Sequence, residues 1–157
     1  PSTREIQGAM DRALASALAT RTRRVLEETH PPLVLDALGW AIEHAEGRPH
    51  VSDLATALAL TPRALTRGFR ASGFVSPRSL LIWGRLVWAS HLLERPSETA
   101  ESVALRLGYA TGGGLGKVMK QYAGCTCTDL LEKGGVAWAL KVLARRGLRP
   151  KGEKGKK

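Results

Sequence analysis

The sequence lacks the cysteine content of a disulfide-stabilised secreted domain. Its 157 residues include two cysteines, Cys125 and Cys127, which are too close together for an ordinary disulfide within a helical fold. A reduced, intracellular protein is therefore expected. Two cysteines without a neighbouring pair of histidines also fail as a zinc site. The histidines are scattered without metal-ligand spacing, at His30, His44, His50 and His91.

Long apolar runs and catalytic motifs are missing as well. No run approaches the ~18–20 apolar residues that a membrane span needs, and no signal peptide is visible. The glycine-rich stretch 112–117 lacks the Walker spacing and a preceding strand, so it is not expected to bind a nucleotide. We therefore expect no enzyme activity, cofactor or metal. The sequence begins at Pro1 rather than methionine, as a processed or excised piece of a longer protein would.

Aromatic residues are scarce, at 5% of the sequence, whereas hydrophobic residues make up 43%. Alanine and leucine must then supply the core, which favours helices over sheets. Acidic residues are too few to balance the basic ones: 24 Lys and Arg stand against 14 Asp and Glu, and the formal net charge is +10. This excess predicts a polyanionic partner, most often a nucleic acid.

A helix-turn-helix pattern occupies 51–69, and such a unit lays its second helix in the major groove of DNA. Leu54 and Ala55 fall on one face of the first helix, and Ala59 and Leu60 make the turn. An ordinary helical hairpin with a solvated basic face would show a similar pattern, so this stretch alone leaves both interpretations open.

The second helix of this unit has clear start signals. Thr61 is a favourable N-cap and Pro62 a favourable first residue. Leu65 and Phe69, four residues apart, are expected to face the core. The outward positions then carry charge for phosphates and donors for base edges; they are Arg63, Thr66, Arg67 and Arg70.

The pattern recurs further along the chain. Ala104 stands 49 residues after Ala55, and Gly108 stands 49 residues after Ala59. Beyond the turn the offset becomes 50, because the second copy has one extra turn residue. Two units in register are poorly explained by a chance hairpin, so the repeat predicts DNA binding.

This two-unit pattern resembles the DNA-binding domain of the AraC/XylS family of bacterial transcription regulators. The resemblance implies seven helices in two subdomains with a rigid connecting helix. It also implies two recognition helices that enter successive major-groove turns on one face of the DNA. The match covers about 33–131 and rests on Leu54-Ala55, Thr61, Leu65, Arg67, Phe69, Arg70, Arg85-Leu86, Ala89, Leu92-Leu93, Val103-Ala104, Gly108-Tyr109, Leu115, Lys117, Lys120 and Gly124.

The predicted fold is all-α, with two helix-turn-helix subdomains (homeodomain-like, AraC-type) joined by a long connecting helix and flanked by extra terminal helices. The connecting helix is expected to start at the Ser76-Pro77 cap and to run to about Leu93. The expected division is an N-terminal helix in 1–32, the first unit in 33–75, the connecting helix in 76–95, the second unit in 96–133, and an extra helix with a basic tail in 134–157.

Residues 3–28 are predicted to form one helix, ended by Pro31 and Pro32. Its apolar stripe is expected to pack on the domain or on a second copy of the chain. The stripe consists of Ile6, Met10, Leu14, Leu18, Val25 and Leu26.

In the first unit the resemblance assigns base reading to Arg63, Thr66 and Arg67. An arginine can donate two hydrogen bonds to a guanine edge, and a threonine can bond a base or touch a thymine methyl. Thr61, at the helix start, and Arg70 are better placed for phosphates.

The second unit departs from the family where base-contacting side chains are expected, because glycines stand there. The remaining candidate contacts suit phosphate more than bases, since lysine is a point charge; they are Thr111, Gly112, Gly113, Lys117 and Lys120. Either the bare backbone approaches the phosphates closely, or the unit has lost base reading and keeps a packing role. Weak, non-specific contact is the favoured interpretation.

The sequence thus predicts major-groove binding to double-stranded DNA and control of transcription, mainly through the first unit, on the nucleoid in the bacterial cytoplasm. RNA polymerase and a second copy, through 3–28, are candidate partners; a membrane is not. The lysine-rich tail, 150–157, is expected to add non-specific DNA affinity. The alternative is an AraC-like fold with degraded DNA reading that recruits a partner protein.

Overall fold

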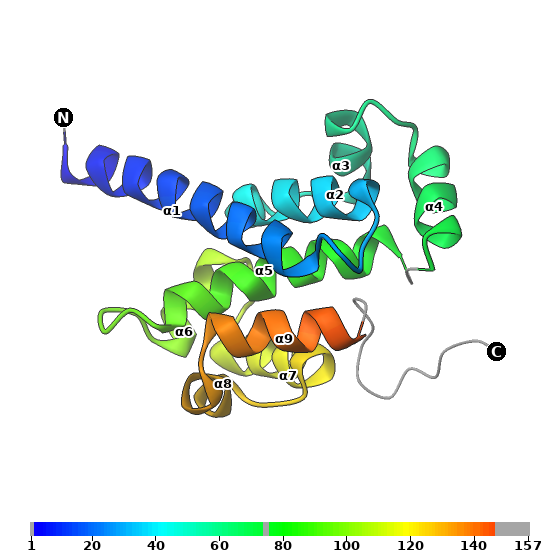
Figure 1. Cartoon of the computed structure of the whole chain (residues 1–157). Coiled ribbons are helices and arrows are strands. Elements are labelled where there is room, and N and C mark those ends of the chain that lie inside the picture. Colours follow the sequence, from blue (N-terminus) through cyan, green and yellow to red (C-terminus); the bar gives the residue numbers. More distant parts are fainter. Residues whose placement is uncertain (1, 74–75, 147–157) are drawn as a thin grey trace.

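The computed structural model describes residues 2–73 and 76–146, and these residues form helices and connecting turns (Figure 1). The all-α prediction is confirmed for them. The lysine-rich tail lies outside the described residues. In chain order the helices are α1 (Thr3–Leu26), α2 (Pro32–Glu43), the short 3₁₀ helix η1 (Ala45–Gly47), α3 (Val51–Ala57), α4 (Pro62–Ala71), α5 (Pro77–Leu93), α6 (Ala100–Arg106), α7 (Gly112–Ala123), α8 (Cys127–Lys133) and α9 (Val136–Arg146).

Helix α5 runs through the middle of the molecule and contacts both halves (Figure 1). The Ser76 hydroxyl accepts a hydrogen bond from the N–H of Ser79 at 3.1 Å, so the predicted cap and connecting helix are confirmed. α2 approaches α5 closely because Gly84 has no side chain: a Cβ there would come within 2.6 Å of the Cβ of Ala41. The residue before Gly84, Trp83, is buried edge-on against Tyr122 of α7. One continuous core therefore carries both helix-turn-helix units on a common helix.

The two helix-turn-helix units share one turn geometry. Ala59 and Gly108 both have left-handed backbones, with φ of 57° and 86°. The next N–H in each unit donates to a carbonyl of the first helix, at 2.8 Å and 2.9 Å. These two bonds run from Leu60 to Ala55 and from Tyr109 to Ala104. Glycine adopts the left-handed conformation freely, whereas alanine is strained in it. The 49-residue repeat is therefore confirmed in the backbone itself.

Helix α1 lies along α2, and its N-terminal turns extend beyond the end of α2 (Figure 1). Only part of the predicted stripe is buried. Ile6 is 50% exposed, Met10 53% and Val25 46%. The face of α1 that packs on the domain overlaps this stripe only in part and is rich in small residues, which let helices approach closely. Its buried members are Ala15, Leu18, Ala19, Thr22 and Leu26.

The sequence predicted that Pro31 and Pro32 end α1, but the structure shows that they do not. α1 ends at Leu26, whose carbonyl accepts the N–H groups of Thr29 and His30 at 3.1 Å and 3.0 Å. Pro31 is the N-cap of α2 and Pro32 its first residue. A proline is tolerated there because the first helical N–H has no intrahelical partner in any case.

An ionic cluster fixes the second unit against the rest of the molecule. Arg106 of α6 donates to Asp11 of α1 at 2.9 Å, to Glu46 of η1 at 3.1 Å and to Glu98. Arg95 also binds Asp11, at 2.8 Å. We call these five residues the Arg106 cluster. Because segments far apart in the sequence meet there, it restrains α6 relative to the first half of the chain.

Candidate nucleic-acid interface

Helix α4 presents its polar face outward because its start and its buried side are both fixed. The Thr61 hydroxyl accepts a hydrogen bond from the N–H of Ala64 at 3.1 Å. Leu65 and Phe69 are completely buried in the core. With these two side chains facing inward, the opposite side of the helix is exposed, and it carries Arg63, Thr66, Arg67 and Arg70.

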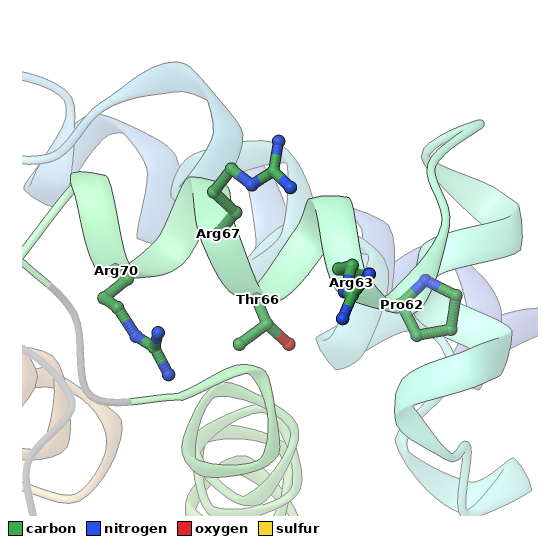
Figure 2. A pocket seen from close by; sticks show the side chains of 5 residues that line it. All are labelled: Pro62, Arg63, Thr66, Arg67 and Arg70. Atoms are coloured by element: carbon green, nitrogen blue, oxygen red, sulfur yellow. The ribbon is translucent and has the colours of Figure 1, made fainter.

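Figure 2 shows these four side chains, with Pro62, around an open hollow on α4. In this view Arg67 projects to one side of α4, and Thr66 and Arg70 project to the other. Within the described part of the chain, none of the three guanidinium groups forms a salt bridge. Three positive charges therefore face solvent without a neutralising carboxylate, which suits a polyanion. The structure brings together the residues that the sequence assigned to base reading.

Helix α7 has the same framework as α4. The Thr111 hydroxyl accepts a hydrogen bond from the N–H of Gly114 at 3.1 Å, as Thr61 does in the first unit. Leu115 and Met119 are completely buried. Lys117 and Lys120 are exposed on the helix surface, so the structure leaves both ammonium groups accessible.

The start of α7 holds a contact that the sequence did not predict. The N–H of Gly112 donates to Oε2 of Glu101, on α6, at 2.8 Å. A Cβ at Gly112 would lie 2.6 Å from that oxygen. Nothing in the sequence pattern pointed to Glu101, because a carboxylate in the first turn of a short helix is ordinary. Its proximity to Gly112 follows from the packing of α6 against α7.

The other glycines at this site have more room. A Cβ at Gly113 would meet its nearest neighbour, the Thr111 hydroxyl, at 3.5 Å, and a Cβ at Gly116 would meet nothing within 4 Å. Side chains can therefore be added at these two positions, while a side chain at Gly112 would require the Glu101 carboxylate to move.

The two cysteines have the chemistry of packing residues. Both are free and buried, and burial raises the pKa of each thiol. A thiol with a raised pKa is a poor nucleophile, so a packing role fits better than redox chemistry. Among the described residues no group of three His, Cys, Asp or Glu side chains could hold a metal. None of the described helices has the length and hydropathy of a membrane span.

Two helix-turn-helix units on a common helix, each with an exposed basic second helix, define a double helix-turn-helix DNA-binding domain. A family model of this kind, described as "Helix-turn-helix domain" and of AraC type, matches residues 54–133, about half of the chain. The chain belongs to the AraC/XylS family of DNA-binding transcription regulators, and the resemblance seen in the sequence is confirmed. The family consists of regulators rather than enzymes.

Solved structures of DNA-binding regulators share the fold. One is a DNA-binding transcriptional dual regulator from Escherichia coli K-12, with a TM-score of 0.58 and 21% identity over 67% of this chain and 94% of that one. Another is the DNA-binding domain of AdpA, a global transcriptional factor, in complex with a target DNA. It has a TM-score of 0.50 and 25% identity over 73% of this chain and 96% of that one. No curated protein sequence matches this chain.

Proposed function

We propose that this chain reads double-stranded DNA in the major groove with α4, holds phosphates with α7, and so regulates transcription on the bacterial nucleoid. The observation that carries the proposal is the exposed face of α4, where three arginines lie without a neutralising partner among the described residues. A regulator of similar fold, AdpA, has been crystallised through its DNA-binding domain with a target DNA.

The chemistry of α4 divides its polar residues into two roles. Arg63 and Arg67 each carry the forked donors that pair with guanine O6 and N7, and Thr66 lies between them for a thymine methyl or a base acceptor. Thr61, at the start of the helix, and Arg70, at its far end, flank this set and suit the phosphates on either side. Base reading then resides in one helical face about one turn long.

The second unit contributes affinity rather than base preference. Lys117 and Lys120 are exposed point charges, which attract phosphate without distinguishing sequence. Thr111, Gly112 and Gly113 lie at the helix start, where the N–H of Gly112 is already donated to the Glu101 carboxylate.

The common helix α5 sets the spacing of the two contacts. With α4 and α7 held on one core, we propose that they enter successive major-groove turns, ~34 Å apart along the duplex. A short DNA site covering one turn would engage α4 alone.

Partners other than DNA are part of the same proposal. Ile6, Met10 and Leu14 stay exposed on α1 although α1 also docks on the domain, so a second copy of the chain is a candidate for this face. RNA polymerase is the other candidate, because regulators of transcription act on it. Sedimentation of the chain with and without residues 1–30 tests the first idea: loss of a dimer supports it, and a monomer in both cases excludes it.

Selection of preferred sites from random double-stranded DNA tests the proposed function. One constrained half-site, with a neighbouring turn that is bound without base preference, is the expected result. Two equally constrained half-sites would contradict the division of roles between α4 and α7. Binding without any specificity ratio at several salt concentrations would instead favour the interaction-protein alternative, with degraded DNA reading.

A further inference from the structure

The Glu101–Gly112 contact places a carboxylate at the start of the second recognition helix. Oε2 of Glu101 accepts the N–H of Gly112 at 2.8 Å, and the N–H of Gly114 is taken by Thr111 at 3.1 Å. Glu101 is otherwise exposed to solvent. Its charge therefore faces outward at the end of α7 where helix geometry directs positive potential.

The first unit has no such carboxylate. By the repeat, the equivalent of Glu101 is Ser52, and the equivalent of Gly112 is Pro62. Ser52 carries no charge, and Pro62 has no N–H to donate. The first difference changes the charge at the start of the recognition helix and the second removes a donor there, while the backbone geometry is shared.

Gly112 and Glu101 are coupled by packing, because the Glu101 carboxylate occupies space that a side chain at position 112 would need. A Cβ on residue 112 would lie 2.6 Å from Oε2 of Glu101, so the carboxylate would have to move away from the N–H of residue 112 to make room. Glycine at this position therefore lets the carboxylate stay on that N–H. The same packing does not explain Gly113 or Gly116, which both have room for a Cβ.

We propose that Glu101 is a specificity-determining residue that keeps DNA phosphates away from the start of α7. Its carboxylate occupies the N–H that a phosphate oxygen would accept, and its charge repels the approaching backbone. The second unit is thereby restricted to its lysines, and sequence preference rests on α4. This inference relies on the proposed function, since it concerns how the second unit meets DNA.

Two substitutions separate the charge of Glu101 from its hydrogen bond. Glu101→Gln keeps an acceptor for Gly112 but removes the charge; Glu101→Ser copies the first unit and frees the N–H as well. Glu94 supplies a matched control, because its Oε1 accepts the N–H of Val136 at the start of α9, at 2.7 Å. Glu94→Gln therefore removes the same charge from the same kind of cap, on a helix that the proposed function does not place on DNA.

The measurement is the Kd of the full chain for a selected duplex and for a random duplex, over a range of salt concentrations. Glu101→Gln should bind both duplexes about fivefold more tightly than the parent, the repulsion of two unit charges ~4 Å apart in water. Glu101→Ser should bind at least as tightly, with a salt slope steeper by up to about one. Thermal unfolding of each variant establishes that the helices are intact.

Each possible outcome either supports or overturns the inference. Tighter binding by the Glu101 variants, and not by Glu94→Gln, supports the inference. A parent that binds DNA while Glu101→Gln gains no more than Glu94→Gln overturns the inference and leaves the proposed function standing. A parent and variants that all fail to bind any duplex would overturn the proposed function, and the inference with it.

Discussion

The two helix-turn-helix units have the same backbone and different surfaces. Each has a threonine N-cap, a left-handed turn residue and two completely buried side chains on its second helix. The exposed face of α4 carries arginines and a threonine, whereas α7 begins with glycines and a carboxylate contact.

This comparison shows that framework and DNA chemistry are separable within one motif. The buried side chains determine how each helix is rotated, and the outward positions are then free to differ. α7 keeps the packing of a recognition helix even though its outward positions hold little that can distinguish bases.

The largest expected effect is the loss of stability when the equivalent core residues Phe69 and Met119 are truncated. Phe69→Ala and Met119→Ala each empty a completely buried site, and such truncations cost about 2–5 kcal/mol of the free energy of unfolding. Chemical denaturation should give decreases of similar size for the two. A decrease in one variant alone would mean that the two frameworks are not equivalent.

Arg63→Ala or Arg67→Ala should separate the units by function. Each change removes a forked donor from α4 and should weaken binding to the selected site by ~1–3 kcal/mol while relaxing base preference there. Repeating the site selection with each variant measures this. Arg24→Ala is a matched control, an exposed arginine on α1. If both α4 variants keep the parental base preference, the base-reading assignment is wrong.

Replacing Lys117 and Lys120 with alanine should weaken binding to all sequences alike. These lysines are expected to neutralise phosphates, so the salt slope should fall by about one for each lysine removed. Affinity measurements on selected and random duplexes show whether the weakening is uniform. Weakening confined to the selected duplex would show that α7 reads bases.

Adding a side chain to α7 tests whether readout can be restored. Gly116→Arg places a guanidinium where a Cβ has no neighbour within 4 Å, and a new base preference of up to ~1 kcal/mol is expected about one helical turn from the first half-site. Gly112→Arg is the contrasting variant, because its Cβ would displace the Glu101 carboxylate from the N–H of residue 112; its gain in base preference should be smaller than that of Gly116→Arg. A larger gain in base preference for Gly112→Arg than for Gly116→Arg would contradict the packing of Glu101 against the start of α7.

The smallest effect concerns the acid stability of the Arg106 cluster, which holds the second unit in place. Burial raises the pKa of Asp11, but hydrogen bonds from Arg95 and Gln7 and the charge of Arg95 outweigh it, so the net pKa is lowered. A carboxyl with a lowered folded-state pKa stabilises the fold above its unfolded pKa, near 3.8, and this contribution disappears as the pH falls further.

Melting temperatures of the parent and of Asp11→Asn, measured from pH 7 to pH 3, check this. The parent should lose more stability over the acid part of the range, so the two curves should converge at low pH. Curves that remain parallel would show that Asp11 contributes no pH-dependent stability.

The local features of this fold could be predicted from the sequence. The caps at Thr61 and Ser76 lie next to the helices that they start, and the 49-residue repeat requires no knowledge of packing. The outward arginines of α4 follow directly from the buried spacing of Leu65 and Phe69. Helix periodicity and capping act over a few residues, so they leave a direct signal in the sequence.

Tertiary structure decided which faces and which distant residues meet. The apolar stripe of α1 was only partly a guide, because hydrophobicity does not say which side of a helix finds a partner. Leu18 and Leu26 of the stripe are buried, but the other buried residues of α1 are the small Ala15, Ala19 and Thr22. The Arg106 cluster joins segments as far apart as Asp11 and Arg106, and the Glu101 carboxylate reaches Gly112 only because α6 packs on α7. Such contacts depend on how helices are arranged in space, and no periodic pattern along the chain records them.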